Sequence, residues 1–184
     1  MRKSRRASLE RFEIEAGAIT MDIILEELTA GMPDARQFMR VMIRLLAAMF
    51  LGAIIGVQRE QTRKAAGLRT HMLVALGAAL FMLAPVISGM DSADLSRVIQ
   101  GLATGIGFIG GGTILKLSEE REIHGLTTAA GIWMTAAVGV AVGLGRLGLA
   151  LLSVALTWFI LAVVGKIEHK IEHRISAGQE AQNQ

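Results

Sequence analysis

The chain has 184 residues, of which 52% are hydrophobic, and its mean hydropathy of +0.50 is higher than a soluble domain of this length normally shows. It contains no cysteine, which excludes disulfides, thiolate metal sites and cysteine nucleophiles. The net charge of +3 comes with apolar blocks, so we interpret the basic residues as markers of cytoplasmic loops and not as a nucleic-acid surface.

The N-terminal part, residues 1–37, is polar to amphipathic and ends at a break around Pro33. Its basic start is not followed at once by an apolar region, so it does not fit a secretory signal. The basic residues within 1–20 conflict with the orientation deduced below, and Met21 begins a less basic alternative start. A misassigned initiation codon would explain the conflict.

Five apolar stretches follow, each close to the ~20 residues that a helix needs to cross a bilayer. The first carries Arg40 and Arg44 in its opening turns, and we expect their long side chains to reach the interface. The sequence therefore predicts an all-α integral membrane protein whose membrane domain covers 38–166. The five transmembrane helices are predicted at 39–57, 71–89, 98–117, 127–145 and 147–165.

Basic residues are shared unequally between the two sets of loops. The 58–70 and 118–126 loops and the C-terminal tail hold most of those near span ends, which places them in the cytoplasm and the N-terminus on the other side. In the tail, 167–184, isoleucine recurs every four residues, which predicts a short amphipathic cytoplasmic helix. The H-x-x-E-H pattern inside it is a near-repeat of IEHK and IEHR, so we interpret it as a solvated helix and not as a zinc site.

A faint internal repeat relates the first four spans. GAIIG (52–56) is followed by a charged loop and GLRT (67–70), and GFIGG (107–111) by a charged loop and GLTT (125–128). The chain would then consist of two parallel two-helix repeats, related by an axis along the membrane normal, and a fifth helix. Short Gly-Leu patterns also arise by chance in apolar sequences, so the duplication stays open.

Glycine is concentrated in the third and fourth spans, although each costs about 1 kcal/mol relative to alanine in a helix in water. The G-x-G-x-x-G at 105–110 lies inside one membrane-length run, without the strand that a dinucleotide site requires. Small residues let membrane helices approach closely, so we expect packing within the chain or against a partner. A helix broken at 110–112, with free carbonyls for a cation, is the alternative. The candidate contact residues are Gly101, Gly105, Gly107, Gly110, Gly111, Gly112, Gly139 and Gly143.

Polar residues at the span ends are the second group of candidates. No Asp or Glu occurs at 61–90, 95–118 or 123–167, which argues against an ion pathway lined by intramembrane carboxylates. The acids at span ends are expected to form local ion pairs or a ligand site. The threonines that follow Gly67 and Gly125 are expected to cap helices, with an anion site at a helix N-terminus as the alternative. The full set is Arg59, Glu60, Arg69, Thr70, Asp94, Arg97, Thr127 and Thr128, and metal ligands stay unassigned.

Long segments of the chain resemble the MgtC/SapB family of membrane proteins. They keep their order and lie in the first four predicted spans and their loops. The segments are GAIIGVQRE (52–60), AAGLRTHMLVALGAALF (65–81), DLSRVIQGLATGIGFIGGGTILK (94–116) and HGLTTAAGIWMTAAVGVAVGLG (124–145).

The resemblance implies a bacterial inner-membrane protein with five spans, a periplasmic N-terminus and a cytoplasmic C-terminus. It further implies a non-enzymatic regulator without a cofactor, linked to low magnesium, stress adaptation and virulence. Such a protein would act as a homo-oligomer or through helix contacts with a partner such as the F1Fo ATP synthase, with Mg²⁺ as signal or ligand. The alternative is a transporter of Mg²⁺ or another cation that uses span 3 backbone and edge carboxylates.

Two departures from the family pattern stand out. The family usually has Glu-Arg-Glu at the end of the first span, whereas this chain has Gln58-Arg59-Glu60, which removes one acid there. The sequence also resembles the short form of the family, without the C-terminal soluble domain, so the SapB or YhiD-like branch is the nearer comparison.

Overall fold

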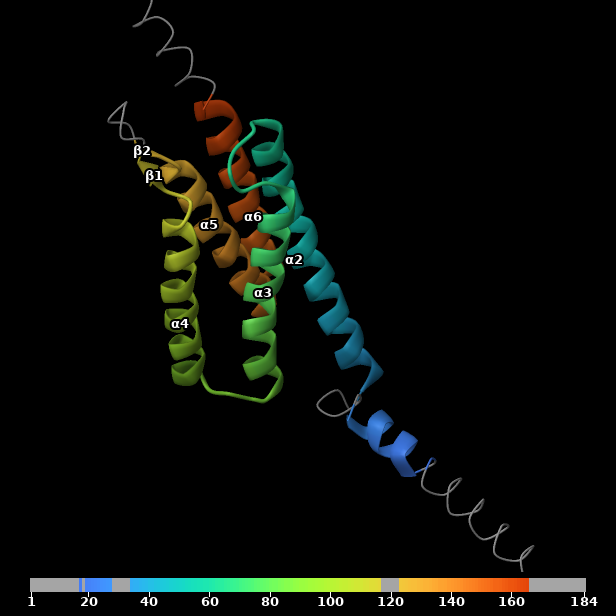
Figure 1. Cartoon of the computed structure of the whole chain (residues 1–184). Helices are drawn as coiled ribbons and strands as arrows, with labels where there is room; N and C mark the ends of the chain where they lie inside the picture. The colour runs from blue at the N-terminus through green and yellow to red at the C-terminus, as the bar shows by residue number, and fades with distance from the viewer. Residues whose placement is uncertain (1–16, 18, 28–33, 117–122, 166–184) are drawn as a thin grey trace, which may run out of the picture. The chain divides into compact units, whose positions relative to one another are not determined.

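The computed structural model describes residues 17, 19–27, 34–116 and 123–165, in two units that divide after Arg40 (Figure 1). In the first unit, residues 19–27 form a helix whose apolar side chains are exposed. The second unit holds the helical bundle. The predicted tail helix, the questioned start and the acidic residues of the 118–126 loop lie largely or wholly outside the described residues.

The described chain is helical apart from one two-residue ladder. The loops are short, so consecutive helices of the bundle run in opposite directions (Figure 1). The elements are α2 (Ala35–Gln61), α3 (Leu68–Ile87), α4 (Ser92–Gly111), β1 (Leu115–Lys116), β2 (Ile123–His124), α5 (Leu126–Gly143), α6 (Leu147–Phe159) and the π-helical continuation η1 (Ile160–Val164). The strands pair antiparallel between α4 and α5.

Four of the described helices are long and apolar enough to cross a membrane: α2, α3, α5 and α6 with η1. They correspond to the first, second, fourth and fifth predicted spans. The helix at the third predicted span is α4, which has 20 residues but carries Asp94 and Arg97 in its first half and falls outside this group. Length and composition therefore support a multi-pass membrane protein and identify four of the five predicted spans.

The helix expected as the third span has other bounds than predicted. It was expected at 98–117, whereas α4 begins at Ser92 and ends at Gly111, with Gly112 as its C-cap. Asp91 explains the early start, because its carboxylate accepts hydrogen bonds from the N–H groups of Ala93 and Asp94, both at 2.9 Å. The glycine triplet at 110–112 thus ends the helix and does not break it midway.

The core of the bundle is formed by small and branched residues of α2, α3, α5 and α6, and α4 contributes nothing to it. The members are Ala48, Leu51, Ile55, Ala75, Ala79, Val138, Ala141, Val142, Ala150 and Val154. The only buried residue of α4 is Gly110. This helix lies against α3 and α5 from outside (Figure 1).

Glycines let α2 and α5 approach the backbone of α3 on two sides. A Cβ added at Gly52 would lie 2.6 Å from the carbonyl oxygen of His71, and one added at Gly143 would lie 2.7 Å from that of Ala79. Gly139 is packed against Ala75 in the same way. These residues are used as small contact positions inside the chain, as membrane helix packing requires.

Candidate functional site

Arg59, near the C-terminal end of α2, points into the bundle. Its side chain is buried, with 3% of the residue exposed, and its Nη2 donates a hydrogen bond to Thr128 Oγ1 in the first turn of α5, at 3.0 Å. Its Nε is buried without a partner. A guanidinium with one hydroxyl as its recorded partner is an unusual buried group, because charges are normally paired when they leave water.

His71, in the first turn of α3, forms a hydrogen-bonded chain with α5. Thr135 Oγ1 lies 2.7 Å from His71 Nδ1 and 2.8 Å from the carbonyl oxygen of Gly131. Which nitrogen of the imidazole carries the proton decides whether the hydroxyl donates to His71 or accepts from it. Nε2 is fully buried and has no partner.

Gln58 completes what we call the polar cluster: Gln58, Arg59, His71, Thr128 and Thr135. Its amide Nε2 donates to the carbonyl oxygen of Leu161 in η1 at 3.1 Å, while Oε1 is buried without a partner. The cluster thus joins α2, α3, α5 and η1 near the end of the bundle where α2 ends and α3 begins. It holds three polar atoms without a recorded partner: the N–H donor Arg59 Nε, the acceptor Gln58 Oε1, and His71 Nε2, whose role depends on the tautomer.

Two of the predicted site residues, Arg59 and Thr128, are brought together by the fold, but not as expected. The expected local ion pair between Arg59 and Glu60 is wrong. Glu60 Oε2 instead accepts from the backbone N–H of Leu68 at 3.0 Å and so caps α3. The expected threonine caps are also wrong, because Gly67 and Gly125 occupy the N-cap positions.

The remaining polar candidates are not part of the cluster. The ion pair between Asp94 and Arg97 is confirmed, at 3.3 Å, and both side chains are largely exposed in the first half of α4. Arg69 and Thr127 are exposed, and Thr70 is half-buried. We interpret these residues as solvated surface positions.

Sequence reasoning missed His71, Thr135 and Gln58. The available signal for His71 was that it is the one ionisable residue of the predicted span 71–89, and ionisable residues in spans commonly mark functional positions. The sequence also carries no sign of the contact that Arg44 makes: its Nη1 donates to the carbonyl oxygen of Gly143 at 3.0 Å.

The outer face of α4 forms the second candidate site. A Cβ added at any of four glycines of this helix would meet no atom within 4 Å, and Phe108 between them is 87% exposed. We call this surface the α4 face; its glycines are Gly101, Gly105, Gly107 and Gly111. Gly110 instead lies against Ala129 of α5, and Gly112 lies in the turn after the helix.

The expectation that the fourth span also offers glycines to a partner is wrong. Gly139 and Gly143 of α5 are buried and packed against α3. Of the two helices whose glycines were predicted to contact a partner, α4 is therefore the one whose glycines face outward.

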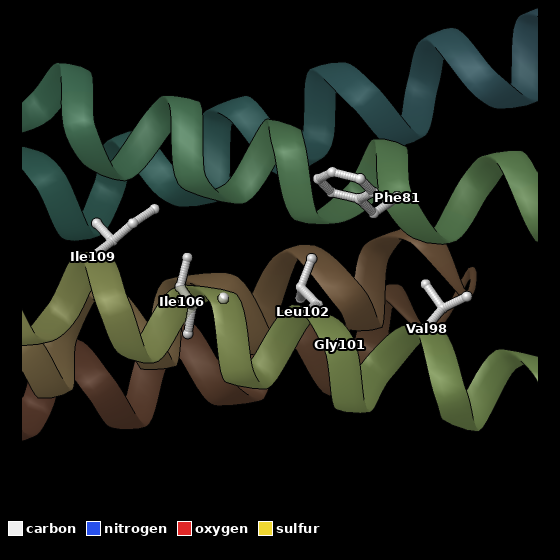
Figure 2. Close-up of a pocket in the computed structure, with 7 residues that line it drawn as sticks. Phe81, Val98, Gly101, Leu102, Ile106 and Ile109 are labelled. Carbon is white, nitrogen blue, oxygen red and sulfur yellow. The ribbon is translucent and has the colours of Figure 1, made fainter.

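An apolar groove runs between α3 and α4 beside this face. It has a volume of about 430 Å³ and is lined by Phe81 of α3 together with Gly101, Gly105 and branched residues of α4. Figure 2 shows Leu102 and Ile106 directed toward α3. A groove of this kind in a membrane protein fits apolar side chains or lipid tails.

A metal centre has little support in the described part of the chain. No group of three His, Cys, Asp or Glu residues there could hold an ion. The carbonyl oxygens at the end of α4 are engaged as well. Gly110 accepts from Thr113 N at 3.0 Å, and Gly111 accepts from Ile114 N at 3.1 Å.

Three named proteins are similar to this chain. SrpB of Synechococcus elongatus is 44% identical over 130 residues, which is 65% of this chain and 71% of SrpB. The proposed magnesium transporter YhiD of Escherichia coli is 37% identical over 139 residues, 72% of this chain and 64% of YhiD. MgtC of Salmonella typhimurium is 45% identical over 104 residues, 56% of this chain but 43% of MgtC.

A protein-family model also matches the chain. The model of the MgtC family matches residues 45–170, which include the polar cluster, the α4 face and all of α3 to η1. No solved structure matches the chain. Because the family model covers well over half of the sequence, the chain belongs to the MgtC family.

Proposed function

We propose that this protein is a non-enzymatic regulator that binds a membrane partner through the α4 face. The observation behind this proposal is that four glycines of α4 have open space where a Cβ would stand. The helix that contains them lies outside the core of the chain. Glycine without an internal neighbour weakens a helix and gains no packing within the chain. A second helix that approaches α4 closely supplies the missing contact.

The partner is a transmembrane helix, either of a second copy or of another inner-membrane complex. The family resemblance makes the F1Fo ATP synthase the first candidate, with low magnesium as the signal and with stress adaptation or virulence as the setting. No cofactor takes part in this proposal. Phe108 and the groove beside Gly105 would give such a helix both a protruding ring and a recess.

The proposal includes five spans, with the N-terminus in the periplasm and the C-terminus in the cytoplasm. Supporting this count, α3 and α5 both begin at the end of the bundle that holds the polar cluster (Figure 1). The chain must return along α4 between them, and 20 residues of helix extend about 30 Å, enough to cross the hydrocarbon core. Single cysteines introduced into the loops, and labelled from each side of the membrane with a charged thiol reagent that does not cross it, test this orientation.

The variants Gly107→Leu and Gly111→Leu test the function directly. A Cβ at either position meets no atom within 4 Å, so we expect insertion and folding to persist while cross-linking to a second copy or partner is lost. Gly148→Leu in α6 is the matched control, because this glycine also has open space. Normal cross-linking by both α4 variants would refute the α4 face as the docking surface.

Cation transport is the second candidate, because the similar protein YhiD is described as a proposed magnesium transporter. Purified protein in liposomes, assayed for Mg²⁺ flux, separates the two functions. Saturable flux that is lost in Asp94→Asn would favour transport. Absent flux together with partner capture would favour regulation.

A further inference from the structure

Two arginines of α2 contact the two ends of α5. Arg44 donates to the carbonyl oxygen of Gly143 at the C-terminal end, and Arg59 donates to Thr128 at the N-terminal end. A helix carries partial negative charge at its C-terminus and partial positive charge at its N-terminus. Arg44 is therefore placed where a cation is stabilised, whereas Arg59 is placed where a cation is repelled.

The charge of Arg59 is not balanced by an acid in the segments that the structure describes. The ion pair recorded there is Arg97 with Asp94, and Glu60, the neighbour of Arg59, is engaged with the N–H of Leu68. With 3% of the residue exposed, water does not solvate the guanidinium freely. A buried cation beside a helix N-terminus calls for a negative charge from outside these residues.

The donors around this point are arranged for an anion. Arg59 Nε–H has no acceptor, and its Nη2 is 3.0 Å from Thr128 Oγ1. The first-turn N–H groups of α5, those of Leu126, Thr127 and Thr128, have no recorded acceptor in the described chain. Unpaired N–H groups at a helix start, together with a guanidinium, form a common anion-binding arrangement.

The N-terminus of α3 provides an internal comparison. Both α3 and α5 begin with leucine after an N-cap glycine. At α3, the carboxylate of Glu60 accepts from the N–H of Leu68, so an anion already fills that position. At α5 the N-cap Gly125 instead lies against the neutral carbonyl oxygen of Thr113, and Arg59 contacts Thr128 in the first turn. The start of α3 therefore has a carboxylate of this chain beside it, whereas the start of α5 has a neutral carbonyl oxygen and a guanidinium.

We propose that the N-terminus of α5 and Arg59 together bind a phosphate group. Arg59 forms the inner wall, and the ligand enters from the end of the bundle, where Leu126 and Thr127 are exposed. A tetrahedral oxyanion can accept from several backbone N–H groups and from a guanidinium at once. This site lies on α2 and α5, apart from the α4 face, so the phosphate site and the proposed function can be tested separately.

A phosphate group at this depth has two sources, free phosphate or a phosphomonoester from the aqueous side, and a phospholipid headgroup. Purified protein in a phosphate-free detergent is titrated by calorimetry with inorganic phosphate at constant ionic strength. In a parallel titration, short-chain phosphatidic acid is compared with the matched diacylglycerol. Saturation by inorganic phosphate identifies a soluble ligand, and saturation by phosphatidic acid alone identifies the lipid.

Arg59→Gln should weaken the binding of phosphate by about tenfold or more, since a hydrogen bond to a charged group is lost. The control is Arg69→Gln, which removes an exposed charge from the first turn of α3 and should change affinity less than about twofold. If Arg59→Gln does not fold, Thr128→Val removes the hydroxyl that orients the guanidinium and should weaken binding several-fold. Unchanged affinity in the folded variant, or no saturation of the wild-type protein in either titration, would overturn the proposal.

Discussion

Arg44 donates a hydrogen bond to the carbonyl oxygen of Gly143, 3.0 Å away, at the corner where α5 turns into α6. The corner contains Gly145, whose positive φ of 77° suits glycine and whose missing side chain leaves room for the guanidinium. Arg44 and Arg59 are separated by the same number of residues as their acceptors Gly143 and Thr128. The two contacts together fix the register of α2 against α5.

Removing the Arg44 contact should destabilise the bundle. Arg44→Leu leaves a helix-terminal carbonyl without its charged donor, and we expect a loss of about 1.5–3 kcal/mol in the free energy of unfolding. Titration of the purified protein from mild detergent into dodecyl sulfate, followed by circular dichroism, measures it. Arg97→Leu, in an exposed pair, should cost about 1 kcal/mol or less. Equal losses in both variants would contradict the role of Arg44.

The glycines divide into two classes that alanine substitution should separate. Gly52→Ala places a Cβ 2.6 Å from the His71 carbonyl oxygen and 2.9 Å from Ala75 Cβ, so α2 must move away from α3. We expect a loss of about 1–3 kcal/mol. Gly77→Ala meets no atom within 4 Å and should be neutral or stabilising. The same unfolding titration compares them, and a neutral Gly52→Ala would disprove the close contact.

The hydrogen bond between His71 and Thr135 should be detectable as a coupling energy. Thr135→Val keeps the side-chain shape but leaves His71 Nδ1 without its hydrogen-bond partner in a buried site, which should cost about 1–3 kcal/mol. In a His71→Leu background the same substitution should cost clearly less. A double-mutant cycle of unfolding free energies measures the difference. Additive effects would mean that the two side chains do not interact.

Glu60 should act as the cap of α3. Glu60→Ala removes the acceptor of the Leu68 N–H and should cost about 0.5–2 kcal/mol, whereas Glu60→Gln keeps an acceptor oxygen and should restore part of it. Gln61→Ala, at the exposed next residue, is the control. Hydrogen exchange of the α3 N-terminus followed by mass spectrometry localises the effect. Unchanged exchange in Glu60→Ala would show that Glu60 does not cap α3.

The apolar spans could be predicted from the sequence because bilayer thickness sets their length. The positions of α3, α5 and α6 agree with the predicted spans to within a few residues, and α2 extends past its prediction at both ends. The end of α4 was missed, since hydropathy continues through Ile114 and gives no sign that the glycine triplet closes the helix. Caps and turns are decided by local hydrogen bonds that hydropathy does not report.

The site was less predictable because its contacts join residues far apart in the chain. Arg59 was singled out as part of a loop, but its acceptor Thr128 lies on another helix, and the sequence carries no sign of that pairing. The internal repeat stays a hypothesis. Gly56 and Gly110 each lie against the helix that follows, but Gly56 is packed more closely. The orientation in the membrane and the partner likewise stay predictions.

The exclusion of α4 from the core has a mechanical consequence. Ten buried residues hold α2, α3, α5 and α6 together, and none belongs to α4. The contacts of α4 with α3 and α5 lie outside this core, so we expect a tilt or shift of α4 to leave the packing among the other four helices intact. Events at the α4 face would then reach the polar cluster through the link from α4 to the first turn of α5, where Thr128 meets Arg59.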